Sequence, residues 1–107
     1  SQNTFISKKI LIDYFLFPNI GRMDDIWASY YVSAKKHKII YDRPTVFQLR
    51  NKHNLLKDFE DEYIGYKNNM YLIEEISKDP EKIHNFLPVK TSRAFEEWRR
   101  IIANYKF

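Results

Sequence analysis

The strongest constraint on the fold is an apolar periodicity that runs from about Asn54 to Ser77. Its members alternate spacings of three and four residues and are Leu56, Phe59, Tyr63, Tyr66, Met70 and Ile73. This spacing places side chains on one face of an α-helix. We therefore expect a long helix with a stripe that is buried along its length. Gly65, Asn68 and Asn69 have low helix propensity and could split this helix in two.

Two further helices are expected on either side of this segment. The first should begin at Asp24 or Asp25, whose carboxylates can accept hydrogen bonds from the first turn, and should end near His37. Its apolar face carries Ile26, Trp27, Tyr30, Tyr31 and Ala34. The last helix is expected to start at Thr91 or Ser92. Its apolar face carries Ala94, Phe95, Trp98, Ile101, Ile102 and Tyr105.

The remaining segments carry turn and strand signals. Asp79-Pro80-Glu81 is a helix-start sequence and predicts a short helical turn that ends near Pro88. Residues 38–48 are rich in β-branched and aromatic side chains, which predicts an edge strand kinked at Pro44 or two short strands. Residues 4–6 could form another strand, and residues 7–13 a short helix. The expected fold class is α+β, mostly helical, with three or four helices and one or two short strands.

Length and composition limit the possible function classes. A chain of 107 residues fits a single domain, residues 1–107, around one core. The chain has no Cys, which excludes disulfides, thiolate metal sites and a Cys nucleophile. This composition suits a reducing compartment, and we expect a cytoplasmic protein. No apolar run approaches the roughly 20 residues that a membrane span requires, and no signal-peptide pattern is visible.

The charge pattern does not favour nucleic acid as a partner. The net charge of +4 arises from 18 basic and 14 acidic residues. Basic residues gather at positions 35–38 and 50–53, but the acidic residues between 58 and 62 offset them. A nucleic-acid-binding protein more often concentrates its basic residues in one stripe. Solvated helix faces are the simpler interpretation of both clusters.

The segment with the best candidates for catalytic residues leads into the first predicted helix. Pro18-Asn19-Ile20-Gly21 predicts a turn, because Pro fixes φ and both Asn and Gly tolerate positive φ. This turn delivers Arg22, Asp24 and Asp25 to a helix start. Consecutive helical side chains point about 100° apart, so one carboxylate can cap the helix while the other faces a cleft. Alternatively, the carboxylate only caps the helix and Arg22 is its surface partner.

Three motifs in this chain resemble a known enzyme family. They are Arg22-Met23-Asp24-Asp25-Ile26-Trp27-Ala28, Tyr41-Asp42-Arg43-Pro44-Thr45-Val46 and Arg50-Asn51-Lys52-His53-Asn54-Leu55. In this order they resemble the C-terminal part of STELLO-like glycosyltransferases. The Asp-Asp-Ile-Trp-Ala portion is also similar to reversibly glycosylated polypeptides. The resemblance covers about residues 3–73 and does not extend to the last helix.

The resemblance implies specific roles for individual residues. Both families are GT-A-type enzymes, so the implied substrates are a nucleotide-sugar donor and a sugar or glycan acceptor. By resemblance, Asp25 is the first candidate for the acceptor-side base, and Asp24 is the second. Arg22 would bind a phosphate or orient the aspartate. Trp27 would either stack on a sugar or anchor the core, of which we favour the core. His53 is a candidate for substrate binding or for a hydrogen bond to the following helix.

This chain departs from the GT-A pattern in one important respect. It has no Asp-x-Asp triplet, no βαβ alternation and no Gly-rich phosphate loop. A divalent ion such as Mn²⁺ or Mg²⁺ is therefore expected only with a separate donor half. Within this chain, His37, His53 and His84 show no metal-ligand spacing, and we predict no metal site.

We accordingly expect an acceptor-side piece of a GT-A-like fold that is inactive alone. The alternative is a non-enzymatic helical module that binds a protein or nucleic acid. A homo-oligomer that covers an apolar face is a further possibility.

Overall fold

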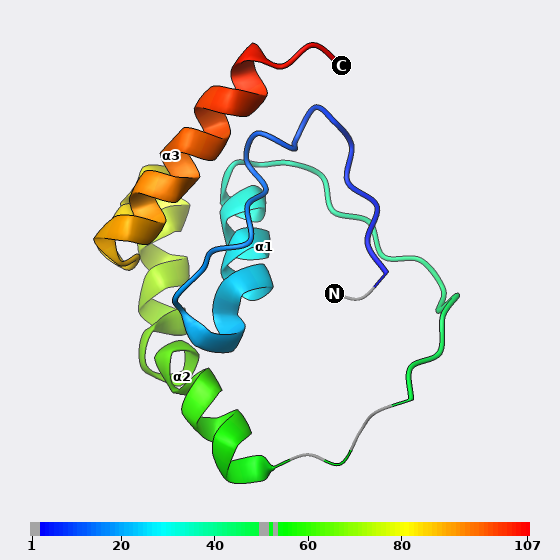
Figure 1. Cartoon of the computed structure of the whole chain (residues 1–107), viewed down its shortest axis with the longest axis vertical. Coiled ribbons are helices and arrows are strands. Elements are labelled where there is room, and N and C mark those ends of the chain that lie inside the picture. Colours follow the sequence, from blue (N-terminus) through cyan, green and yellow to red (C-terminus); the bar gives the residue numbers. More distant parts are fainter. Residues whose placement is uncertain (1–2, 50–51, 53) are drawn as a thin grey trace.

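The computed structural model describes residues 3–49, 52 and 54–107. Five helical elements follow in chain order: the 3₁₀-helix η1 (Gly21–Met23), α1 (Asp24–Ala34), α2 (Leu55–Lys78), the 3₁₀-helix η2 (Pro80–Asn85) and α3 (Val89–Asn104). The three α-helices lie on one side of the molecule, and residues 37–49, which follow α1, curve away from them (Figure 1). No helix in the described part is long and apolar enough to cross a membrane.

The prediction of an α+β fold with short strands is wrong. The described residues are 59% helical and contain neither a strand nor a sheet. Residues 38–48 were expected to supply one or two strands, but residues 37–49 have no regular structure. Their β-branched and aromatic residues favour an extended backbone, yet a strand also needs a neighbour to accept and donate its ladder hydrogen bonds. Residues 4–6 likewise form no strand, and residues 8–13 form turns in place of the short helix expected at residues 7–13.

The turn before η1 packs directly against α2. Asn19 and Gly21 both have positive φ, as the turn chemistry predicted. A Cβ atom on Gly21 would overlap the backbone carbonyl of Asp61 on α2. Glycine is therefore required here both for the backbone conformation and for the close approach of η1 to α2.

The core lies where α1, α2, η2 and α3 meet the segment that precedes η1. Its largest fully buried side chains include Trp27 and Tyr31 of α1, Phe17 of the N-terminal segment and Phe95 of α3. The Phe95 ring makes edge-on contacts with Phe17 and Tyr31, at centroid distances of 5.1 and 5.2 Å. Offset and edge-on aromatic pairs stabilise a core beyond the area they bury. Aromatic residues thus join elements that are far apart in the sequence.

The expectation that the apolar stripe of α2 is buried is also wrong. Helix α2 is continuous through Gly65, but its buried face consists of Gly65, Leu72 and Ile76. Tyr63, Tyr66 and Met70 of the predicted stripe are exposed instead. Periodicity identifies an apolar face but not the neighbour that covers it. The small Gly65 draws α2 close to Met23, so the helix packs through a different face.

The C-terminal part follows the sequence signals more closely. Asp79 caps η2 through a hydrogen bond from the Glu81 amide at 3.1 Å, as the helix-start sequence predicted. Helix α3 starts at Val89, slightly before Thr91. Thr91 is buried, and its hydroxyl donates to the Pro18 carbonyl at 2.8 Å, so it does not cap the helix. This bond ties α3 to the turn that leads into η1.

Candidate functional site

An open cleft of about 830 Å³ lies in front of the N-terminus of α1. Its walls come from the segment before η1, from η1 itself, from the first turn of α1 and from the middle of α2. The lining residues are Tyr14, Leu16, Gly21, Arg22, Met23, Asp24, Asp25, Ile26, Glu62, Tyr66 and Asn69. Three of the residues predicted from the sequence, namely Arg22, Asp24 and Asp25, therefore share one cavity.

The adjacent aspartates Asp24 and Asp25 make different contacts. The Asp24 carboxylate accepts a hydrogen bond from the neighbouring Asp25 amide at 2.8 Å, whereas the N-cap of α1 is Met23 and no described side chain caps the helix. Asp25 also lies on the wall of the cleft, and its backbone carbonyl accepts a hydrogen bond from the Ser29 hydroxyl at 3.0 Å. A helix start thus holds two carboxylates on the wall of an open space.

The described ion pairs of Arg22 cross to α2. Its guanidinium donates to the Asp58 carboxylate at 2.7 Å and lies 3.8 Å from the Glu62 carboxylate. These contacts hold η1 against α2 on one side of the cleft. Because two carboxylates already surround Arg22, its charge is partly neutralised. The described ion pairs of Arg22 thus reach Asp58 and Glu62, and both expected roles, binding a phosphate and orienting the aspartate, stay predictions.

The α2 wall of the cleft consists of Glu62, Tyr66 and Asn69. The Tyr66 hydroxyl donates to the Glu62 carboxylate at 3.1 Å, and this bond raises the pKa of Tyr66. The Asn69 side-chain oxygen accepts from the Trp27 indole at 2.7 Å. This wall therefore offers the cleft a hydroxyl, an amide and a carboxylate, which are groups that can bind polar ligands.

Trp27 and His53 complete the set of predicted site residues. The Trp27 ring is fully buried, and Asn69 accepts from its only polar atom. A buried ring offers no face for a sugar, so the structure supports the core interpretation of Trp27 and not sugar stacking. His53 lies outside the described residues.

The described walls of the cleft carry more acidic than basic side chains. Asp24, Asp25 and Glu62 contribute carboxylates, and Arg22 is the one cationic side chain among the described lining residues. Ionised carboxylates accept hydrogen bonds only, so they match the hydroxyl groups of a polyol. A carboxylate in such a position can also take a proton from a hydroxyl during its reaction.

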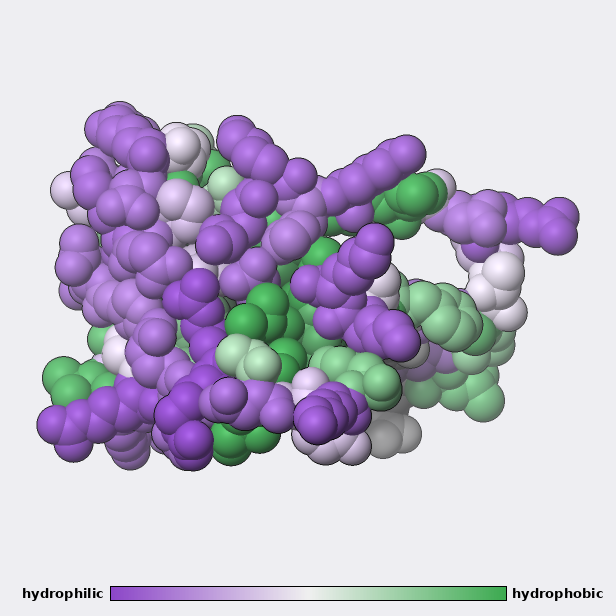
Figure 2. All heavy atoms as spheres, turned by 90° about the horizontal axis from the view of Figure 1, so that it is seen from above, coloured by the Kyte–Doolittle hydropathy of each residue, from purple (hydrophilic) through white to green (hydrophobic). Residues whose placement is uncertain are grey.

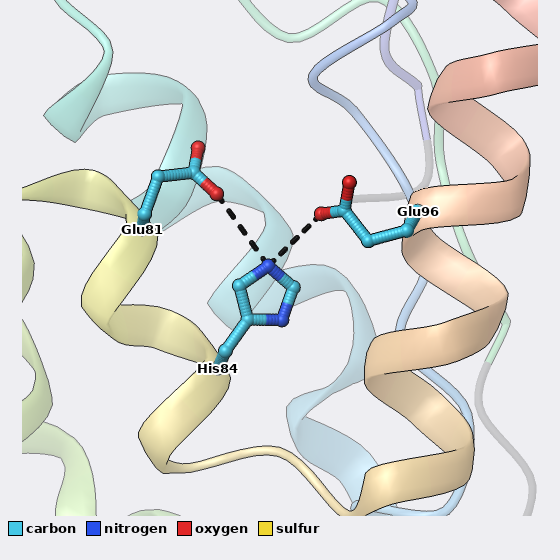
Figure 3. A group of neighbouring side chains, drawn as sticks. All are labelled: Glu81, His84 and Glu96. Carbon is cyan, nitrogen blue, oxygen red and sulfur yellow. Dashed lines mark hydrogen bonds and ion pairs between the residues drawn. The ribbon is translucent and has the colours of Figure 1, made fainter.

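A second group of polar side chains lies between η2 and α3. The His84 ring nitrogen Nε2 is 3.0 Å from the Glu96 carboxylate and 3.5 Å from that of Glu81 (Figure 3). The other ring nitrogen, Nδ1, is 3.0 Å from the Ser92 hydroxyl. The potential ligand atoms of Glu81, His84 and Glu96 lie within 4.8 Å of one another, which is a geometry that a metal ion could use. The sequence did not indicate this cluster, because Glu96 comes from a different helix.

Contacts around this cluster indicate a structural ion-pair network. The Arg99 guanidinium lies 3.2 Å from the Glu81 carboxylate and 3.4 Å from that of Glu96. The Tyr31 hydroxyl donates to Glu81 at 2.7 Å. Burial raises the pKa of Glu81, but the Tyr31 hydrogen bond and the Arg99 charge outweigh it, so the net shift is downward. A divalent ion would have to share both carboxylates with a guanidinium cation, so we assign the cluster to stability.

No known protein family, curated protein or solved structure matches this chain.

Proposed function

We propose that this chain is the acceptor-side part of a nucleotide-sugar-dependent glycosyltransferase, and that it needs a separate donor half for catalysis. The observation that carries the proposal is the position of Asp25 on the wall of an open, polar cleft at a helix start. The resemblance of the motif around Asp24 and Asp25 to GT-A enzymes supports the same reaction. A polyol acceptor suits the cleft because its walls carry carboxylate, amide and phenol groups.

In the proposed reaction, Asp25 acts as general base. Its carboxylate accepts a hydrogen bond from one acceptor hydroxyl and takes the proton as the oxygen attacks the donor sugar. A new bond forms between this oxygen and the anomeric carbon. The bond between the anomeric carbon and the nucleotide diphosphate breaks, and the diphosphate leaves with the electron pair. Asp24 is placed to bind a neighbouring hydroxyl of the same acceptor.

The charge of the cleft selects among acceptors. Among the described lining residues, Asp24, Asp25 and Glu62 outnumber Arg22, whose guanidinium already faces Asp58 and Glu62. Like charges in one cleft repel, so an anionic sugar should bind more weakly than a neutral one. The proposed acceptor is therefore an uncharged sugar or glycan.

Ligand-observed NMR can test this proposal on the chain itself. We expect a neutral methyl glycoside or disaccharide from a small panel to bind, with a dissociation constant in the millimolar range that is common for single sugars. Asp25→Asn removes the charge but keeps the shape, and it should weaken binding about tenfold, because hydrogen bonds to charged groups are the stronger ones. Asp42→Asn is the matched control, since Asp42 is exposed and contacts only the Arg43 amide among described groups.

Two results would contradict the proposal. The first is that no glycoside in the panel binds, and the second is that Asp25→Asn and Asp42→Asn bind equally well. Calorimetry with a nucleotide sugar provides a separate check, because the donor half is not visible in this sequence. Micromolar, Mn²⁺-dependent binding of a nucleotide sugar would show that the donor site lies in this chain.

The second candidate function is a helical interaction module. The observation in its favour is the exposed apolar face of α2, which includes Phe59, Tyr63, Tyr66 and Met70. Large exposed apolar patches commonly mark protein contacts. A nucleic-acid partner would instead require affinity that falls steeply with salt, because bound counterions are released. Titration of the chain with RNA and DNA at two salt concentrations separates these two kinds of partner.

A further inference from the structure

The exposed apolar face of α2 has the spacing of a coiled-coil seam. The α2 stripe, as we define it, contains Leu56, Phe59, Tyr63, Tyr66, Met70 and Ile73. The exposed fractions of these side chains range from 40% for Ile73 to 84% for Met70. The stripe spans about 26 Å of helix at 1.5 Å per residue. Spacings that alternate between three and four residues correspond to heptad positions a and d.

We propose that the α2 stripe pairs with the α2 stripe of a second copy of this chain in antiparallel orientation. The spacings of the stripe read the same in both directions, so a reversed copy matches it in every layer. In this register Leu56 faces the partner's Ile73, Phe59 faces the partner's Met70, and Tyr63 faces the partner's Tyr66. A two-fold axis passes between Tyr63 and Tyr66, so each of these contacts occurs twice in the dimer. This proposal does not rest on the proposed enzymatic function, but the two compete for Tyr66, which also lines the cleft and would be covered in the dimer.

Side-chain size favours the antiparallel orientation over a parallel one. A parallel pair in register would place Phe59 on Phe59 and Leu56 on Leu56. The antiparallel pair places the rigid Phe59 ring opposite the flexible Met70 side chain, which adapts to irregular gaps. Helix dipoles also oppose each other in an antiparallel pair. Side-chain packing and the helix dipoles therefore both favour the antiparallel dimer.

Charges beside the seam are complementary in the same register. Glu60 follows Phe59 and Lys67 follows Tyr66, so both occupy e positions, and both are exposed. In an antiparallel pair, e positions lie beside e positions of the partner, and Glu60 comes next to the partner's Lys67. The two-fold axis creates this ion pair twice. Charges at such positions select partner and orientation in coiled coils.

The aromatic residues of the stripe are already in contact within one chain. The Phe59 ring stacks with Tyr66 at a centroid distance of 5.7 Å and lies 6.5 Å from Tyr63. Their mutual packing restricts rotamers, so less side-chain entropy is lost on pairing. The exposed area of the six side chains is roughly 600 Å² per copy, below the ~800 Å² of a standard interface. We therefore expect a reversible dimer with a micromolar dissociation constant.

Analytical ultracentrifugation over a range of concentrations tests whether the pair forms. The wild-type chain should change from monomer to dimer between about 1 and 500 µM. Tyr63→Glu places a charge in the central layer and should weaken the dimer by at least a factor of about 100. Tyr41→Glu is the matched control, because Tyr41 is 91% exposed and lies outside the helix. A monomer at every concentration, or an equal effect of both changes, would overturn the proposal.

Disulfide trapping tests the orientation, and the absence of native Cys makes it unambiguous. Leu56→Cys and Ile73→Cys chains are prepared separately, mixed and oxidised. The antiparallel register predicts a cross-linked heterodimer and little cross-linking of Leu56→Cys with itself. Because a disulfide requires Cα atoms within about 7 Å, a parallel pair would give the reverse result. The reverse result would refute the proposed orientation.

A charge exchange provides a test that leaves the seam intact. Glu60→Lys should weaken the dimer roughly tenfold, because two attractive pairs become repulsive. Adding Lys67→Glu to the same chain restores opposite charges and should restore dimerisation. Circular dichroism confirms that each variant keeps its helices. If the double variant is as weak as Glu60→Lys, the proposed register is wrong.

Discussion

At the scale of residues, two side-chain hydrogen bonds connect α1 to its neighbouring helices. Trp27 donates to Asn69 of α2 at 2.7 Å, and Tyr31 donates to Glu81 of η2 at the same distance. Both donors belong to buried rings, so each hydrogen bond also satisfies a polar atom in the interior. Leaving a buried polar atom without a partner would cost about 1–3 kcal/mol. These bonds fix the rotation of α1 relative to α2 and η2.

The Glu81 network predicts a specific pH dependence of stability. Burial raises the pKa of Glu81, but the Tyr31 hydrogen bond and the Arg99 charge lower it further, so the folded-state pKa lies below the unfolded value. A group with a lowered folded-state pKa contributes stability above its unfolded pKa, and this contribution is lost as pH falls through the folded pKa. The unfolded value is near 4.5. Glu81→Gln should therefore lose less stability than the wild type between pH 5 and pH 3.

Urea denaturation at several pH values measures this difference. Glu74→Gln is the control, because Glu74 is exposed and its ion pair with Lys78, at 3.8 Å, stays within α2. If the Glu81→Gln and wild-type stabilities fall in parallel below pH 5, the proposed role of the network is incorrect.

At the scale of elements, the approach of η1 to α2 decides where the cleft forms. Gly21 has a φ of 61°, and a Cβ atom there would overlap the backbone carbonyl of Asp61. Gly65 also lies in a tight place, but its neighbour is the flexible end of the Met23 side chain. Backbone cannot move as freely as a methionine side chain. The two glycines therefore differ in what a substitution requires of the structure.

Gly21→Ala should destabilise the fold by about 2 kcal/mol or more, because it combines left-handed strain with a backbone clash. Gly65→Ala should have a smaller effect, because better helix propensity offsets the movement of Met23. Chemical denaturation of both variants measures the two free energies. Equal losses in the two variants would contradict the close contact between η1 and α2.

Local sequence signals predicted the helices but not which of their faces are buried. Periodicity, the Asp79-Pro80 start and the turn ending at Gly21 all act within a few residues, so they could be recognised along the chain. The prediction of strands at residues 38–48 was wrong because a strand forms only when a second strand, often far away in the sequence, lies beside it. The exposure of Tyr63 and Tyr66 was missed for a similar reason, since the face that α2 buries is set by contacts with Met23 and the core.

The candidate site was predictable in part. Arg22, Asp24 and Asp25 are neighbours in the sequence, and the turn before them indicated a helix start. The α2 wall with Glu62 and Tyr66 was not predicted, because only the fold brings it opposite Asp25. The same is true of the Glu81, His84 and Glu96 cluster, whose members come from η2 and α3. Contacts between distant segments leave no local pattern in a single sequence.

At the scale of the whole molecule, the chain leaves a large apolar surface uncovered. Its radius of gyration is 15.0 Å, compared with about 13 Å expected for a compact chain of this length. Residues 38–48 curve away from the helices (Figure 1). Apolar side chains also reach the surface between hydrophilic ones on the face seen in Figure 2. Such a surface is typical of a protein that binds another macromolecule.

The most direct test of the proposed acceptor site is to locate a bound sugar on this chain. Amide resonances of the ¹⁵N-labelled protein are recorded during titration with the best-binding neutral glycoside. We expect the largest shifts at Arg22, Asp24, Asp25 and Tyr66, around the cleft, and in Asp25→Asn these shifts should require about tenfold more glycoside. Shifts confined to α3, or an unchanged glycoside requirement in Asp25→Asn, would show that this cleft is not where the acceptor binds.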